Sequence, residues 1–246
     1  MTHKTFFAAI TAFVASFIFG ADVSANDGAY QVVSPDGHLS ATVVVGSDIS
    51  YTVSRDALQL IAPSQISMTL SDGIVFGQDD KVRKVRRDSR DQVWQATVYK
   101  KSDVRDHYNE MTLEFKEFSL TFRAYDDGVA YRFASKLKGD FTVMSEKAEF
   151  AFAKDWDAFI PYVKQHTKTL ETQYFNSFEN TYKEHRLSEW NKSRLAFAPL
   201  VVNADNGVKV LLTEADLLDY PGMFLYNEGD ASTLSARFAP YPKEMK

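Results

Sequence analysis

Cysteine is absent from the 246 residues, and proline and glycine are scarce, with 7 and 11 residues. Without cysteine the chain has no disulfide, no thiolate metal ligand and no thiol nucleophile, so its stability must come from packing. Histidine is rare as well: after residue 25 only His38, His107, His166 and His185 occur, without the spacing of metal ligands. We interpret each of them as a surface or hydrogen-bonded histidine.

Catalytic sequence motifs are missing too. The chain has no Gly-x-Ser-x-Gly elbow, no phosphate-binding loop, no His-Glu-x-x-His and no dinucleotide fingerprint. We therefore assign no catalytic residue. The formal net charge of −5 argues against nucleic acid as a partner. One dense basic run lies in this acidic chain, and we interpret it as a solvated strand or loop: Lys81, Arg83, Lys84, Arg86, Arg87 and Arg90.

Residues 1–25 have the three-part pattern of a secretory signal peptide. A weakly basic start at His3 and Lys4 precedes an apolar run, and small residues at Val23-Ser24-Ala25 suit a signal peptidase. The alternative is a membrane anchor, but the apolar run is shorter than the roughly 20 residues that a spanning helix needs. The pattern predicts cleavage before Asn26, a periplasmic or secreted product, and no membrane association after the signal is removed.

The mature chain, residues 26–246, alternates apolar and polar residues with period two between turn sequences, which predicts an antiparallel, mostly β protein. We expect strands over 39–45, 49–54, 111–115 and 120–123. Met111, Leu113 and Phe115 should face the core, with Thr112, Glu114 and Lys116 on the wet face. A hairpin is predicted from Leu200–Asn203 and Val208–Leu212, in the middle of a sheet because both arms are apolar. Two packed sheets, a β-sandwich, are the simplest architecture.

Between residues 160 and 192 the β pattern fades, and we expect a long loop with one or two helical turns. Phe175, Phe178 and Tyr182 have spacings that would place them on one helical stripe. The stripe indicates an amphipathic helix packed on the sheet or, alternatively, an aromatic platform for a sugar.

An acidic segment follows the last apolar strand, where Leu211 and Leu212 are succeeded by Glu214, Asp216 and Asp219 and then by Tyr220-Pro221-Gly222. Carboxylates at the end of a rigid buried strand suit calcium, which takes about six to eight oxygen ligands. The alternative is structural, with Thr213 and Asp216 forming a capping box around a short turn. Spacing alone leaves both interpretations open.

The same segment, Thr213 to Leu217 followed by Asp219 to Met223, resembles a signature near the end of the amino-terminal domain of glycoside hydrolase family 97, the α-glucosidase and α-galactosidase family. Four further stretches resemble that domain in the same order, and together they cover essentially the whole mature chain: 34–37, 105–110, 123–132 and 238–242.

The resemblance implies an antiparallel β-supersandwich of the galactose mutarotase type, packed in the full enzyme against a catalytic (β/α)8 barrel. It also implies a calcium ion beside the sugar site, held mainly by barrel glutamates, with one glutamate from this domain. Glu214 matches that metal ligand, and Asp216 and Tyr220 are weaker candidates for substrate binding. The implied partners are the barrel domain and a carbohydrate, an α-glucoside or α-galactoside.

The sequence stops at Lys246, where the link to the barrel should begin, so we expect a fragment, a truncated reading frame or a stand-alone descendant that is inactive alone. The leading hypothesis is a non-catalytic domain of a calcium-dependent periplasmic α-glycosidase. The alternative is a stand-alone carbohydrate-binding module that stacks sugars on Trp94, Trp156, Trp190 or the aromatics from Tyr174 to Tyr182. A sugar epimerase is a third hypothesis, based on fold analogy alone.

Overall fold

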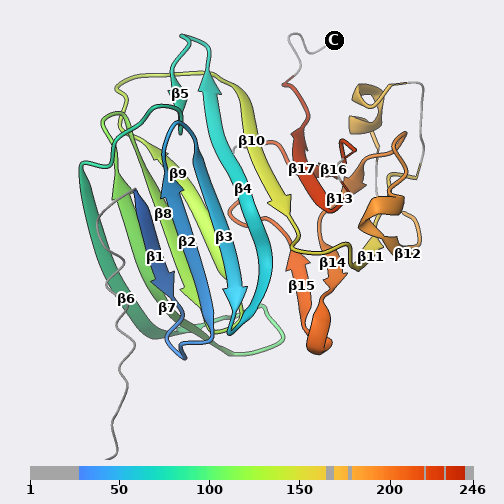
Figure 1. Cartoon of the computed structure of the whole chain (residues 1–246), viewed down its shortest axis with the longest axis horizontal. Coiled ribbons are helices and arrows are strands. Elements are labelled where there is room, and N and C mark those ends of the chain that lie inside the picture. The colour runs from blue at the N-terminus through green and yellow to red at the C-terminus, as the bar shows by residue number, and fades with distance from the viewer. Residues whose placement is uncertain (1–27, 165–168, 177–178, 219, 230, 242–246) are drawn as a thin grey trace, which may run out of the picture.

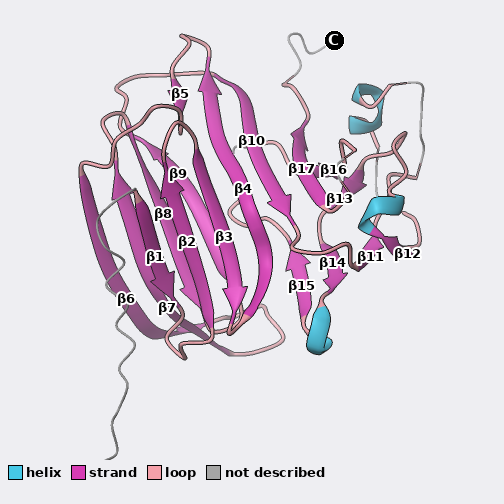
Figure 2. Ribbon diagram, viewed as in Figure 1, coloured by secondary structure: helices cyan, strands magenta, loops and turns pink. Residues whose placement is uncertain are grey.

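A computed structural model describes residues 28–164, 169–176, 179–218, 220–229 and 231–241. The predicted signal peptide, His166 and Phe178 lie outside these ranges. Strands dominate the described residues, and every strand pair is antiparallel, as Figures 1 and 2 show. The expectation of a mostly β, antiparallel sandwich is therefore confirmed. No helix among the described residues is long and apolar enough to span a bilayer.

The largest sheet has nine strands in the order β1-β2-β3-β4-β10-β17-β16-β13, with β5 paired to β4. Its first half forms one layer of the sandwich, and the pairing of β10 with β17 continues it toward the carboxyl-terminal part. The strands are β1 (Ala29–Val33), β2 (Leu39–Val45), β3 (Ile49–Arg55), β4 (Leu58–Leu70), β5 (Val75–Phe76), β10 (Val143–Ala151), β13 (Ala196–Phe197), β16 (Met223–Tyr226) and β17 (Thr233–Phe238).

The second layer is a four-stranded sheet in the order β6-β7-β8-β9, which packs against β1 and β2 (Figure 1). Its strands are β6 (Lys84–Gln95), β7 (Asp103–Glu114), β8 (Phe118–Tyr125) and β9 (Val129–Ser135). Met111, Leu113 and Phe115 are buried as predicted. Thr112, expected on the wet face, is buried instead, because its hydroxyl shares a 2.9 Å hydrogen bond with Thr121 on β8.

A third, smaller sheet has the order β12-β11-β14-β15. Its strands are β11 (Asp157–Ile160), β12 (Lys183–Arg186), β14 (Leu200–Asn203) and β15 (Lys209–Leu212), with three short 3₁₀ helices nearby, η1 (Glu171–Tyr174), η2 (Leu187–Glu189) and η3 (Asp205–Gly207). The predicted hairpin is present as β14 and β15. The predicted position of this hairpin in the middle of a sheet is wrong for β15, which is an edge strand with Leu211 exposed to solvent.

The predicted helical stripe is wrong. In place of an amphipathic helix, the structure has the single-turn η1 and the polar strand β12, and the side chains of Phe175 and Tyr182 are exposed. Tyr174 of the same segment packs against β16, with its ring 5.2 Å from that of Phe224.

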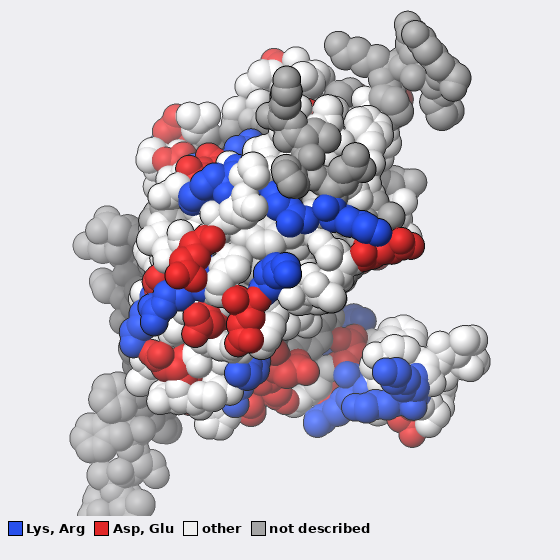
Figure 3. Space-filling model, turned by 90° about the vertical axis from the view of Figure 1, so that its right-hand side faces the viewer, with Lys and Arg blue, Asp and Glu red and all other residues white. Residues whose placement is uncertain are grey.

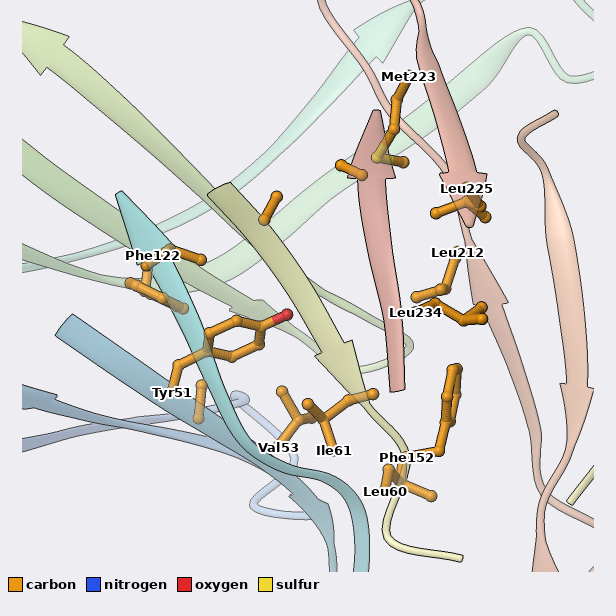
Figure 4. Close-up of a cluster of buried hydrophobic side chains, with 14 of the residues drawn as sticks. Tyr51, Val53, Leu60, Ile61, Phe122, Phe152, Leu212, Met223, Leu225 and Leu234 are labelled. Carbon is orange, nitrogen blue, oxygen red and sulfur yellow. The ribbon is translucent and has the colours of Figure 1, made fainter. Parts of the chain in front are cut away.

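One continuous hydrophobic core joins the three sheets. Figure 4 shows it passing from Tyr51 and Phe122 inside the sandwich, through Phe152, to Leu212 and Leu225. The ring of Tyr51 lies 5.8 Å from Phe122 and 5.7 Å from Tyr131, so it ties β3 to both β8 and β9. Because this cluster is shared, the carboxyl-terminal sheets are fixed to the sandwich, and so is the segment between β15 and β16.

Candidate functional site

The candidate site lies in the segment that connects β15 to β16, residues 213–222, in which Asp219 is outside the described residues. Leu212 is buried, but Thr213 is exposed, so the chain leaves the core abruptly. At Asp216 the backbone adopts a left-handed conformation, φ 62°, and the Leu218 N–H donates to the Asp216 carbonyl at 2.9 Å. The chain turns back on itself and enters β16 at Met223. Residues 213–218 form no helix, so the capping-box interpretation of Thr213 and Asp216 is wrong.

Glu214 is half-buried, and its carboxylate is fixed by the backbone. Both carboxylate oxygens accept the Met223 N–H, each at 2.9 Å. Gly222 lies against the same group, since a Cβ added there would be 3.5 Å from Oε1. The side chain of Glu214 is thus held by the first residue of β16, while Glu214 itself is only half-buried. A hydrogen bond to a charged acceptor of this kind is stronger than a neutral one.

Tyr220 closes the segment onto the nine-stranded sheet. Its hydroxyl donates to Oε2 of Glu146, on β10, at 2.7 Å, and its ring meets that of Phe238 edge-on at 5.6 Å. Burial, and then the charge of Glu146, raise the pKa of Tyr220 above its ordinary value. The tyrosine hydroxyl therefore stays protonated and acts as a donor at neutral pH.

Glu146 shares this environment. Burial is the largest cause of its raised pKa, the negative charge of Glu214 adds to it, and the hydrogen bond from Tyr220 opposes it. Two carboxylates, Glu146 and Glu214, are therefore close enough to repel each other. A cation or a proton placed near them would relieve that repulsion.

Asp216 points elsewhere. Its carboxylate lies 3.7 Å from the guanidinium of Arg132, on β9, and both side chains are largely exposed. Exposed pairs of this kind contribute little to stability. The pair nevertheless links the segment to the edge strand β9. The structure thus brings Glu214, Glu146 and Tyr220 together and directs Asp216 toward the second layer of the sandwich.

A metal ion at this segment would need more ligands than Glu214 and Glu146. Among the described residues, no three histidine, aspartate or glutamate side chains lie close enough together to bind one. Calcium takes about six to eight oxygen ligands. The carboxylate of Glu214 has the chemistry that calcium prefers, but the described acidic side chains around it do not by themselves make a complete site.

The aromatic candidates separate by burial. Trp156 and Trp190 are in the core, and their indole N–H groups donate to Asp205 at 3.0 Å and to the Arg194 carbonyl at 3.1 Å. Trp94 is 58% exposed, near the end of β6. Of the three tryptophans, Trp94 alone could present its ring to a ligand.

Comparison with known proteins identifies the family of the domain. Residues 32–242 match the family model described as Glycosyl-hydrolase 97 N-terminal. The chain belongs to glycoside hydrolase family 97. The match includes Glu214, Asp216 and Tyr220, and it confirms the resemblance noted in the sequence.

Relatives of this family 97 domain are longer proteins. The chain is 44% identical over 216 residues to a retaining alpha-galactosidase of Bacteroides thetaiotaomicron, strain VPI-5482, covering 87% of this chain and 33% of that protein. A family 97 enzyme from Pseudoalteromonas sp. strain K8, solved with acarbose, is 25% identical with a TM-score of 0.73 over 86% of this chain and 32% of its own. A beta-arabinopyranosidase is 23% identical with a TM-score of 0.74, a likeness of fold. The chain spans about a third of these relatives.

Sequence reasoning missed Glu146 in this family 97 domain. Glu146 belongs to β10, some 70 residues before Glu214, and its neighbours give no unusual pattern. Only the pairing of β10 within the nine-stranded sheet brings it to the 213–222 segment. The three described histidines of the mature chain are hydrogen-bonded, as predicted: His38 contacts Asp56 at 2.6 Å, His107 contacts Asp126 at 3.2 Å, and His185 contacts the Tyr162 hydroxyl at 3.1 Å.

Proposed function

We propose that this chain is the non-catalytic amino-terminal domain of a calcium-dependent α-glycosidase, and that it supports a catalytic barrel supplied by further polypeptide. The observation that carries the proposal is the family match over residues 32–242, combined with relatives in which the same domain is about a third of the protein. The name of one relative, a retaining alpha-galactosidase, supports an α-galactoside as the substrate of the complete protein. An α-glucoside is the alternative that the sequence resemblance implies.

In this proposal Glu214 is the calcium ligand contributed by the domain. Its carboxylate is held at the accessible end of β15 by Met223, and its neighbour Glu146 adds negative charge. Calcium, when bound, would supply positive charge beside the sugar. Asp216 and Tyr220 are weaker candidates for sugar contacts, because Asp216 pairs with Arg132 and the Tyr220 hydroxyl is engaged by Glu146.

Reconstitution tests the proposal. Mixing the domain with a separately expressed family 97 barrel should restore hydrolysis of an aryl α-galactoside or aryl α-glucoside in the presence of calcium. Glu214→Gln should raise the calcium concentration required by about tenfold or more, since it weakens a carboxylate ligand. Glu184→Gln, at an exposed glutamate of β12, is the matched control and should leave the requirement unchanged. Failure of the wild-type domain to restore hydrolysis would count against the proposal.

A stand-alone carbohydrate-binding module is the second candidate, and the exposed ring of Trp94 is the observation that favours it. Stacking of a sugar on this ring should change tryptophan fluorescence on titration with maltooligosaccharides or galactosides, and Trp94→Phe should abolish the change. Flat titrations of the wild-type chain would remove this candidate.

We also propose export to the periplasm or beyond it, on the pattern of residues 1–25. Expression of the full chain in a secreting host should yield a product whose first residue is Asn26, as measured by intact mass. A product that retains Met1 and sediments with membranes would contradict this, and would favour the anchor.

A further inference from the structure

The hairpin of β6 and β7 extends beyond the sheet to which it belongs. Its ladder runs from Lys84 paired with Glu114 to Gln95 paired with Asp103, whereas the ladder between β7 and β8 begins only at Tyr108. Five pairs, from Asp91–His107 to Gln95–Asp103, therefore have strand partners only in each other among the described residues. We call residues 91–107 the arm. Five pairs correspond to about 17 Å of two-stranded ribbon.

Large apolar side chains are exposed on the arm. Trp94 and Val104 face each other across the two strands, and Val98 and Tyr99 lie in the connecting loop. The exposed fractions are 56% for Val93, 58% for Trp94, 94% for Val98 and 69% for Tyr99. Apolar surface gathered at the end of a protruding element is typical of an interaction site.

Polar pairs along the arm hold it in shape. Arg105 forms a two-point contact with Asp91, with both nitrogen–oxygen distances at 2.8 Å, and Gln92 donates to Asp106 at 3.1 Å. At its base His107 contacts Asp126 at 3.2 Å. An isolated two-stranded ribbon is only marginally stable in water. The two-point contact and the polar pair favour the paired form of the arm, and an element that is already paired loses less entropy on binding.

The arm and the Glu214 segment border the same sheet. β6 and β9 are its two edge strands, the arm extends from β6 and β7, and Asp216 reaches Arg132 on β9. Trp94 lies on the same face of β6 as Arg86, the face turned away from the sandwich core. In Figure 3 a lobe with basic side chains, at the height of the arm in Figure 1, stands apart from the body across a recess.

Charge indicates what kind of surface the arm fits. Lys100 and Lys101 follow Tyr99 in the loop of the arm, in a chain with a formal net charge of −5. A partner for this tip needs an apolar groove with acidic residues beside it. It must also be as wide as a folded domain if it is to contact both the arm and the Glu214 segment at the other edge of the sheet.

We propose that the arm is a docking element for the catalytic barrel, inserting Trp94 and Tyr99 into its surface while the Glu214 segment meets the same barrel at the opposite edge of the sheet. This inference rests on the proposed function. The barrel is the occupant because about two thirds of each relative lies outside the matched domain, and a body of that size can span four strands.

Binding measurements test the inference. The wild-type chain and a Trp94→Ser, Tyr99→Ser double variant are titrated with a separately expressed family 97 barrel by isothermal calorimetry. We expect the double variant to bind about tenfold more weakly or worse, because buried aromatic anchors carry much of an interface's affinity. Phe175→Ser is the matched control: this ring is 90% exposed beside η1, far from the arm in sequence, and should leave affinity unchanged. Melting temperatures should be the same for all three proteins.

The outcomes are distinguishable. Equal affinity of the wild-type chain and the arm variant would overturn the inference and leave the proposed function standing. No binding by the wild-type chain would contradict the proposed function and, with it, the inference. A wild-type dimer in sedimentation that the arm variant loses, with barrel affinity unchanged, would make a second copy of this chain the occupant and also overturn the inference.

Discussion

Tyr51 shows how one polar atom is accommodated in the shared core. Its ring is buried between β3, β8 and β9, and its hydroxyl donates to the Glu149 carbonyl at 2.9 Å. Burial raises the pKa of this hydroxyl well above its ordinary value, so it stays a donor. Tyr51→Phe should lower the free energy of unfolding by about 1 kcal/mol, because it leaves a buried carbonyl with one bond fewer. Urea denaturation measures this, with Tyr99→Phe on the exposed arm as a control that should have no effect.

Glu146 predicts a pH dependence. The pKa of Glu146 in the folded state is raised, mainly by burial, so the protonated side chain favours folding. Its contribution to the free energy of unfolding is complete below the ordinary pKa and is lost as pH rises through the raised value. Glu146→Gln keeps an oxygen for the Tyr220 hydroxyl but cannot ionise. The variant should therefore gain stability relative to the wild type between acidic and neutral pH. Urea midpoints compared at a series of pH values check this, and parallel curves for the two proteins would show that the wild-type carboxyl is not perturbed.

Three residues show which parts of the candidate site and the core could be predicted from sequence. Acids that follow an apolar strand indicated the segment, and the resemblance to family 97 then made Glu214 the candidate ligand. Glu146 was not found, because its role depends on which strands become neighbours, and a local pattern does not contain that information. Thr112 was placed on the wet face by alternation alone, but a cross-strand partner, Thr121, satisfies its hydroxyl and permits burial.

Turns are the elements in which glycine matters most. Gly77 and Gly207 both have left-handed backbones, φ 96° and φ 75°. A Cβ on Gly207 meets nothing within 4 Å, whereas one on Gly77 would lie 2.9 Å from the Ile66 carbonyl oxygen. Gly207→Ala should therefore cost only the conformational strain, about 1 kcal/mol, and Gly77→Ala should cost clearly more. Denaturation of the two variants gives the comparison, and equal losses would show that the Ile66 backbone yields without cost.

Strands with a strong apolar alternation were predicted closely from sequence. The expected strand 39–45 has the bounds of β2, and 49–54 differs from β3 by one residue. The two failures have different causes. β12, Lys183–Arg186, is a short strand of charged and polar residues and has no apolar side to detect. β15 has the composition of a central strand but lies at an edge, because position in a sheet is set by tertiary pairing rather than by local sequence.

At the scale of the whole molecule, the shared core predicts a single unfolding transition. Leu120 is buried in β8 within the sandwich, while Trp156 and Trp190 are buried in the carboxyl-terminal part of the same cluster. Leu120→Ala should destabilise the chain by about 2–5 kcal/mol. In a Trp94→Phe background, the fluorescence of the two buried tryptophans should shift to lower urea concentration together with far-ultraviolet circular dichroism. Two separated transitions would mean that the sandwich and the smaller sheet unfold independently.

The edge strand β6 affects how readily the protein aggregates. β6 leaves one side of its backbone unpaired among the described residues, yet Arg86, Arg87, Asp88 and Arg90 line it and are exposed. A bare β edge is a template for fibril growth, and charged side chains make it costly for a second molecule to add its own strand there. The basic run therefore opposes aggregation. Replacing its charged side chains with neutral ones should favour fibrils over soluble protein.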